Sequence, residues 1–236
     1  MESLCIAIGL VAYMRMTRYD IMPMLSELST VMQHPRTRHG EAMRWFAAFL
    51  LTSREVGIMY YRGPGGMTNK DVMQWIGYGD ASWQTIKGIY SRYGVMIKNK
   101  MLHLQEGIYQ GAVLARHIRE NSIPSGAATI AELHGTVATV ERILPLQGMS
   151  EEIAGLGMNG TTDAKVSVET PKIRVSEPVI CLDNASLAAV INNDTSKKSK
   201  GLRRVARLVQ YVKDLQTEEL IFIQPIRGTE QQANPV

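Results

Sequence analysis

The sequence predicts a sheet domain of mixed α/β or α+β class that follows a helical N-terminal segment. Apolar residues recur at helical spacing over residues 1–62, and a glycine-rich break follows at residues 62–66. Beyond this break, strand-like apolar runs come first and then alternate with helical stretches. Because 45% of the 236 residues are hydrophobic, the chain can bury a core and is not expected to be disordered over most of its length.

The N-terminal segment is expected to contain at least two helices. One apolar face repeats at steps of three and four residues from Met22 to Met32, and a second runs from Ala42 to Leu50. A break is expected at residues 34–37, because Pro35 disfavours helical backbone in the residue before it. The sequence RGPGG at 62–66 is the clearest linker. We therefore predict two units, a helical segment over residues 1–66 and a sheet domain over residues 67–236.

Short apolar runs predict the strands of the second unit. They are expected over residues 72–78, 93–97, 101–104, 179–182 and 220–223, with Lys98-Asn99-Lys100 as a polar turn between the second and the third. Helices are expected over residues 130–144, ending at Pro145, and over residues 185–191 and 202–215. Residues 155–177 are rich in Gly, Thr and Pro and are predicted to form a loop.

Cysteine content and hydropathy favour an intracellular protein that is not embedded in a membrane. The two cysteines, Cys5 and Cys181, are too few for a disulfide framework or a cysteine-based zinc site. The longest apolar run, residues 4–14, is too short to cross a bilayer and lacks the flanks of a secretory signal. Whether the compartment is cytoplasm, nucleus or an organelle stays open.

The net charge of +4 is unevenly distributed. Seven basic residues with no acid among them lie in one stretch: Lys197, Lys198, Lys200, Arg203, Arg204, Arg207 and Lys213. A local basic cluster indicates an anionic partner such as a phosphate backbone. From charge alone, a solvated helix face explains the stretch equally well.

Three acidic residues stand beside apolar neighbours. Asp80 follows the first predicted strand, Asp183 follows the strand at 179–182, and Glu132 lies near the start of a predicted helix, next to its core face. A carboxylate in such surroundings is costly unless it is paired or bound to a cation, so the three are candidate ligands of a hard divalent ion. Taken singly, Asp80 and Asp183 are each better explained as a turn or helix N-cap residue, and only together do they point to a metal site.

An ordered series of motifs resembles the ribonuclease H domain of copia-type retrotransposon polyproteins. The segments are GYGDASW (77–83), SRYGVMI (91–97), AATIAELHG (127–135), VICLDNASLAAV (179–190) and IFIQPIRGTEQQANP (221–235). They are similar, in the same order, to the family's DADW strand, its next strand, its AEY helix, its CDN junction and its C-terminal tail. Residues 9–63 resemble the connector between polymerase and ribonuclease H, so the resemblance covers nearly the whole chain.

The resemblance implies a ribonuclease H-like mixed five-stranded sheet flanked by helices and preceded by an α-helical connector. It implies an endonuclease that cuts the RNA strand of RNA–DNA hybrids with two Mg²⁺ ions, or Mn²⁺ in their place. Asp80, Glu132 and Asp183 match the family's catalytic and metal-binding acids, and Asn234 falls where the family has its fourth. Nucleic acid would be bound by the basic residues Lys197, Lys198, Lys200, Arg203, Arg204 and Arg207. The partners implied are an RNA–DNA hybrid or structured RNA, and a reverse transcriptase or larger ribonucleoprotein complex.

Departures from the family pattern support an alternative function. Asn234 lacks the charge of the fourth acid, although the nearby Glu230 can replace it. No YxDD-type polymerase motif is present, and residues 106–124 and 155–178 are longer than the family's usual connections. The alternative is a domesticated, catalytically weakened scaffold that binds RNA or protein in an assembly such as an organellar ribosome.

Overall fold

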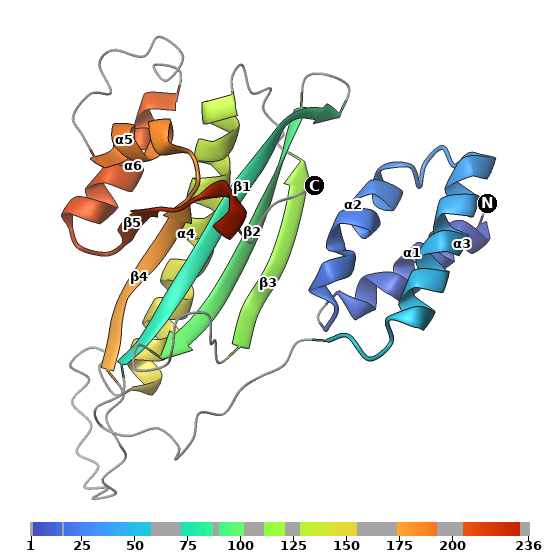
Figure 1. Cartoon of the computed structure of the whole chain (residues 1–236), viewed down its shortest axis with the longest axis horizontal. Coiled ribbons are helices and arrows are strands. Elements are labelled where there is room, and N and C mark those ends of the chain that lie inside the picture. The colour runs from blue at the N-terminus through green and yellow to red at the C-terminus, as the bar shows by residue number, and fades with distance from the viewer. Residues whose placement is uncertain are drawn as a thin grey trace, which may run out of the picture.

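The computed structural model describes residues 2–15, 17–57, 72–86, 90–101, 111–120, 128–154, 174–192 and 205–231. These residues form an N-terminal group of helices and a sheet with helices packed against it (Figure 1). The predicted mixed α/β fold is therefore confirmed. Of the helices in these ranges, none has the length and apolar character needed to cross a membrane.

The N-terminal helices are α1 (Glu2–Met14), the 3-10 helix η1 (Tyr19–Ile21), α2 (Met22–Thr30) and α3 (Thr37–Thr52). The predicted break is confirmed, since α2 ends before Pro35 and α3 begins after it. α2 and η1 contact the edge strand of the sheet, and Figure 1 shows α1, α2 and α3 on the side of that edge. They share a core of buried side chains made of Ile8, Val11, Ile21, Met22, Leu25, Leu28 and Phe46.

A buried arginine joins the two ends of this helical group. The Arg18 guanidinium donates to both carboxylate oxygens of Asp20, at 2.9 and 2.7 Å, and to the Ser53 carbonyl oxygen and hydroxyl, each at 2.8 Å. It also lies 5.7 Å from the centre of the Phe49 ring. The hydrogen bond to Asp20 raises the pKa of Arg18, so the buried guanidinium keeps its charge.

The sheet has five strands in the order β3-β2-β1-β4-β5. β1 (Val72–Ile86), β2 (Tyr90–Met101) and β3 (Gly111–Glu120) form an antiparallel meander. β4 (Arg174–Leu182) and β5 (Phe222–Pro225) add to its other side, and both β1–β4 and β4–β5 pair in parallel. Parallel pairs need a crossover, and α4 (Ala128–Ile153) belongs to the chain that links β3 to β4.

The main core lies between one face of the sheet and α4, α5 (Ala185–Asn192) and α6 (Ala206–Thr217). It includes Val95 and Ile97 of β2 with Leu133 and Val140 of α4, all fully buried. The opposite face carries a smaller buried cluster of four residues, Tyr78, Met96, Val179 and Cys181, against which Ile76 and Ile226 pack.

β1, β2 and β4 are longer than the apolar runs that predicted them, whereas β5 has the length of its run at 220–223 but lies two residues later. The expected turn at Lys98-Asn99-Lys100 is wrong, because these residues continue β2 and pair with Ile76, Trp75 and Gln74 of β1. Met101 therefore ends β2 rather than beginning a third strand, and residues 102–104 lie outside the described ranges. β1 likewise continues beyond residue 78 to Ile86.

The expected helix end at Pro145 is also wrong, because this proline lies inside α4. An internal proline costs about 3 kcal/mol through a lost hydrogen bond and a clash. The continued helix offsets that cost by packing: Ile143 and Ser150 are buried on either side of the proline, and the Trp75 indole N–H donates to the Ser150 hydroxyl at 2.9 Å.

Candidate metal centre

Asp80 lies inside a strand, not at its end. It belongs to β1, opposite Gly94 of β2, and is only 8% exposed. No helix begins there, so the N-cap alternative for this residue is wrong. The Ala81 backbone N–H donates to Asp80 Oδ1 at 2.8 Å, which holds the carboxylate beside the strand.

Asp183 directly follows β4. The N-cap role that was one interpretation of Asp183 belongs instead to the next residue, Asn184. The Asn184 side-chain oxygen accepts the Leu187 backbone N–H at 2.9 Å, which is the bond of an N-cap residue to the third residue of a helix. Asn184 therefore caps α5. The Asp183 carboxylate is left to face the other acids.

Glu132 reaches the site because α4 crosses β1 at very short range. A Cβ added to Gly79 would lie 2.9 Å from the Gly135 carbonyl oxygen and 2.6 Å from the Thr139 hydroxyl, so only glycine fits there. Gly135 lies about one turn after Glu132 on α4. The close crossing at Gly79 thus brings the first turns of α4, and Glu132 with them, next to Asp80.

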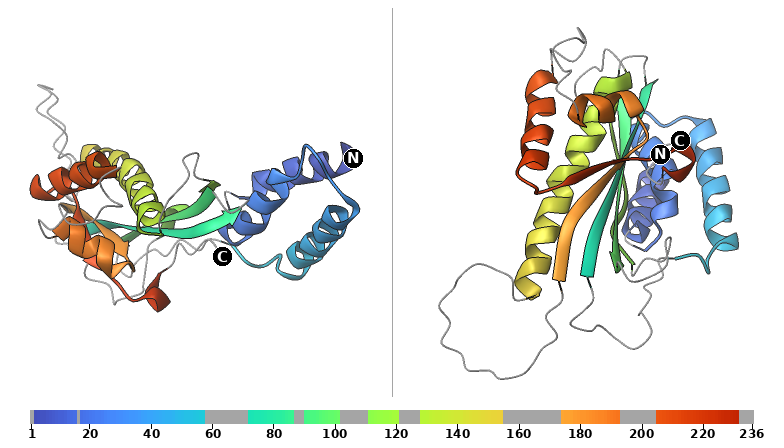
Figure 2. Two further views of the ribbon diagram at one scale, coloured as in Figure 1. Left: turned by 90° about the horizontal axis from the view of Figure 1, so that it is seen from above. Right: turned by 60° about the vertical axis from the view of Figure 1, so that its left-hand side comes forward.

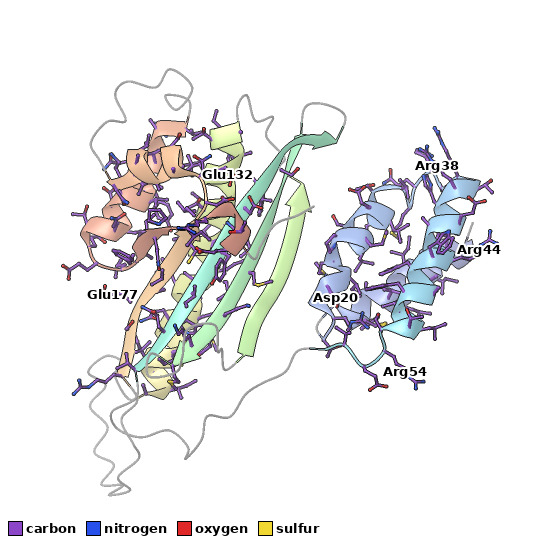
Figure 3. All side chains as sticks on the ribbon, in the orientation of Figure 1. Asp20, Arg38, Arg44, Arg54, Glu132 and Glu177 are labelled. Atoms are coloured by element: carbon purple, nitrogen blue, oxygen red, sulfur yellow. The ribbon has the colours of Figure 1, made fainter. Side chains whose placement is uncertain are left out.

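The structure brings the three predicted acids together. Asp80, Glu132 and Asp183 each offer a carboxylate oxygen, and these three atoms lie within 4.8 Å of one another. Figure 3 shows Glu132 on α4, beside β1. The three come from segments of β1, α4 and β4 that are far apart in the sequence, and we call them the acidic trio.

The electrostatics of the acidic trio favour a bound cation. Burial, together with the charges of Asp80 and Asp183, raises the pKa of Glu132 to about 8, although a hydrogen bond from the Ala81 backbone lowers it. The three carboxylates therefore repel one another when all are ionised. A divalent cation would remove that repulsion, and an all-oxygen donor set suits Mg²⁺ or Mn²⁺. The residues present thus fit such an ion.

Most of the other predicted site residues lie outside the described ranges. These are Lys197, Lys198, Lys200, Arg203, Arg204 and Asn234. Arg207 is described and lies exposed in the first turn of α6. None of the three acids of the trio belongs to this helix. The predicted role of the basic stretch in binding nucleic acid stays a prediction.

Sequence reasoning missed the glycines and the cap that position the acidic trio. Gly79 and Gly135 set the approach of α4 to β1, and Asn184 fixes the start of α5 next to Asp183. The sequence offered one indication of their importance, which is that each of these residues stands within three positions of one of the acids.

Comparison with known proteins gives solved structures that include ribonuclease H domains. The N-terminal RNase H domain of rv2228c from Mycobacterium tuberculosis, solved as a fusion with maltose-binding protein, is 11% identical with a TM-score of 0.42, covering 67% of this chain and 86% of that one. RNase H1 from Halobacterium salinarum NRC-1 is 12% identical with a TM-score of 0.38, covering 68% and 90%.

A third structure extends over the N-terminal helices as well. The foamy viral protease-reverse transcriptase in complex with dsDNA is 10% identical with a TM-score of 0.45, and the match covers 97% of this chain and 38% of that one. No protein-family model matches the chain, and no curated protein matches it. The copia-type origin therefore stays a prediction.

Proposed function

We propose that the chain is a metal-dependent endonuclease of ribonuclease H type that hydrolyses the RNA strand of RNA–DNA hybrids. The observation that carries the proposal is the convergence of Asp80, Glu132 and Asp183 within 4.8 Å. In this proposal residues 67–236 form the nuclease domain, and residues 1–66 correspond to the connector of copia-type polyproteins. Mg²⁺ is the expected cofactor, with two ions bound and Mn²⁺ able to replace them.

Carboxylates in this arrangement suit phosphodiester hydrolysis, whose transition state gathers negative charge. Divalent ions held by Asp80, Glu132 and Asp183 would activate the attacking water and would neutralise charge on the leaving oxygen. The chain's part is to hold the donor atoms in place: Asp80 through its position in a paired strand and the Ala81 N–H, and Glu132 through the packing of α4 on β1.

Glu132 couples metal binding to a proton. With its pKa near 8, the carboxyl group is mostly protonated at neutral pH while no cation is bound. A ligand carboxyl must be ionised, so binding of a cation displaces this proton from Glu132. Metal affinity is therefore expected to rise with pH up to about pH 8.

The proposed substrate would be held mainly through its backbone. RNA–DNA hybrids are recognised by phosphate and 2′-hydroxyl contacts rather than by base edges in a deep groove. The seven basic residues at 197–213, of which Arg207 is exposed on α6, supply cations for the phosphates. A reverse transcriptase or a larger ribonucleoprotein complex is the proposed protein partner.

Cleavage of a labelled RNA–DNA hybrid in the presence of Mg²⁺ or Mn²⁺ tests the proposal. The wild type should cut the RNA strand, and Asp183→Asn should reduce the rate by about 100-fold or more, the effect of removing one group that stabilises transition-state charge. Asp214→Asn is the matched control, because Asp214 is exposed on α6, where its Oδ1 accepts the Gln210 side-chain amide at 2.7 Å. A wild type that does not cut, or an Asp183→Asn variant that cuts equally well, contradicts the proposal.

The alternative of a non-enzymatic scaffold gives the opposite results. Purified from its native source, such a chain would co-migrate stably with a large particle and show no metal-dependent cleavage. The assembled acidic trio favours the nuclease, since a scaffold has no need for three carboxylates in mutual repulsion.

A further inference from the structure

The pairing of β1 with β4 ends just before the acids that these strands present. In the described strands, the last partners of this parallel pairing are Tyr78 of β1 and Cys181 of β4. Each stands two residues before a member of the acidic trio, Asp80 and Asp183 respectively. On its other side β1 continues to pair, since Asp80 lies opposite Gly94 of β2. A strand ladder therefore fixes Asp80 relative to β2, but the ladder with β4 does not reach the two acids.

The segment after β5, residues 226–231, begins at the end of β4. The Ile226 backbone N–H donates to the Leu182 carbonyl oxygen at 2.7 Å, one residue before Asp183. The 3-10 helix η4 (Gly228–Glu230) follows, and Figure 2 shows it on the side of the sheet opposite α4. The segment is therefore anchored beside one acid and turns on the side of the sheet away from α4.

The turn of η4 brings the segment past Asp183 and back to β1. A Cβ added to Gly228 would lie 3.8 Å from Asp183 Oδ2, which is ordinary contact distance. The Gln231 backbone N–H donates to the Gly228 carbonyl oxygen at 3.3 Å and closes the turn. The Gln231 side-chain amide donates to the Gly79 carbonyl oxygen at 3.0 Å, one residue before Asp80. One side chain thus connects β1 to the end of β4 at the point where their ladder has ended.

We propose that Gln231 is a positioning residue of the metal centre, whose amide fixes the Asp80 carboxylate relative to Asp183. This inference rests on the proposed function, because it presupposes that the acidic trio binds a divalent cation. Gly79 precedes Asp80 in the chain, so a hydrogen bond to its carbonyl oxygen restrains the backbone that carries the carboxylate. A fixed spacing matters most for Mg²⁺, which demands nearly octahedral geometry with oxygens at about 2.0–2.1 Å. It matters less for Ca²⁺, which accepts flexible geometry at about 2.3–2.6 Å.

The test compares two glutamines that connect β1 to β4 or its end through a side-chain amide. Gln231→Met keeps the length of the side chain and removes its N–H donor. Gln74→Met is the matched control, because the Gln74 amide joins β1 to β4 at the opposite end of their pairing. There it donates to the Ser176 hydroxyl at 3.0 Å and to the Glu177 carbonyl oxygen at 3.1 Å.

The measurements are ion affinities of the full-length chains and do not depend on cleavage. Mn²⁺ is titrated into each protein, and binding is followed by calorimetry and by the electron paramagnetic resonance signal of the free ion. The affinities for Mg²⁺ and Ca²⁺ are obtained by competition against Mn²⁺. Circular dichroism checks that each variant is folded.

Gln231→Met should bind Mg²⁺ at least about tenfold more weakly than the wild type, in the range seen when groups that support metal ligands are removed. Its affinity for Ca²⁺ should fall less, so the ratio of the two affinities should decrease. Gln74→Met should keep both wild-type affinities, because its hydrogen bonds lie far from the acids along the strands.

Four results would overturn the inference and leave the proposed function intact. They are wild-type affinities in Gln231→Met, equal losses in the two variants, equal losses for the two ions, and a Gln231→Met chain that is unfolded. A wild type that binds no divalent ion would overturn both the inference and the proposed function.

Discussion

At the scale of single residues, Glu132 makes the metal-free protein sensitive to pH. Its pKa of about 8 in the folded chain lies above the ordinary value of 4.5, so the folded state binds this proton more tightly than the unfolded state. The associated stability is complete below about pH 4.5 and is lost as the pH rises through about 8, at about 1.4 kcal/mol for each unit of pKa difference.

Glu132→Gln should remove this dependence. In EDTA at pH 5 the variant and the wild type should unfold at similar temperatures, because a protonated glutamic acid resembles glutamine. At pH 9 the variant should be more stable, since it carries no buried charge beside Asp80 and Asp183. Thermal unfolding between pH 5 and pH 9 measures the difference. If the unfolding temperatures of the two proteins changed with pH in the same way, burial and the neighbouring acids would not raise the pKa of Glu132.

The second residue-scale prediction concerns the cap beside Asp183. Asn184→Ala removes the acceptor for the Leu187 N–H and should lower the free energy of unfolding by about 1 kcal/mol, the usual loss for an N-cap. Asn184→Ser should restore most of it, because a serine hydroxyl can accept the same bond. Denaturant unfolding of the three proteins decides the matter, and equal losses in the Ala and Ser variants would contradict the capping role.

At the scale of elements, the site depends on how closely α4 crosses β1. Gly79→Ala puts a methyl group 2.6 Å from the Thr139 hydroxyl and 2.9 Å from the Gly135 carbonyl oxygen, so α4 must move away. Such overpacking costs about 1–3 kcal/mol. The shift also carries Glu132 away from Asp80, so Mn²⁺ affinity should fall together with the free energy of unfolding.

A glycine on the same helix provides the control for this prediction. A Cβ at Gly148 meets no atom within 4 Å, so Gly148→Ala should stabilise α4 by about 0.5–1 kcal/mol and leave Mn²⁺ affinity unchanged. Calorimetric titration with Mn²⁺ and chemical unfolding of both variants give the comparison. Unchanged metal binding in Gly79→Ala would show that the crossing does not position Glu132.

Two elements show why local sequence signals failed. The run Lys98-Asn99-Lys100 has the composition of a turn, but it lies in a central strand paired on both sides, with β1 and with β3. Pro145 has the effect of a helix breaker locally, but buried contacts before and after it hold α4 together. In both cases tertiary pairing and packing outweigh local preference, and no window of neighbouring residues contains that information.

At the scale of the whole molecule, the order of the motifs along the chain predicted the residues of the site, which the local patterns of apolar and polar residues alone did not identify. The acids at 80, 132 and 183 could be found because each stands in a short segment that resembles one family motif, and the structure brings all three together. The hydrogen bonds from Gln231 to the Gly79 carbonyl oxygen and from Ile226 to the Leu182 carbonyl oxygen could not be predicted. They join residues more than 40 apart through a side-chain amide and a backbone N–H that carry no sequence signal.

The predicted division into two units leads to the last prediction. The N-terminal core and the sheet core are separate sets of buried residues, and every member of the acidic trio lies after residue 72. A chain containing only residues 67–236 should therefore fold and bind Mn²⁺ with the affinity of the full-length chain. It would lose only the contacts of α2 and η1 with β3, at the edge of the sheet farthest in strand order from β4 and β5. Circular dichroism and calorimetric titration of the two proteins make the comparison. A shortened chain that is unfolded, or that binds Mn²⁺ at least about tenfold more weakly, would mean that the helical segment is an integral part of the metal-binding domain, since such a loss is as large as that expected from removing a group that supports the site.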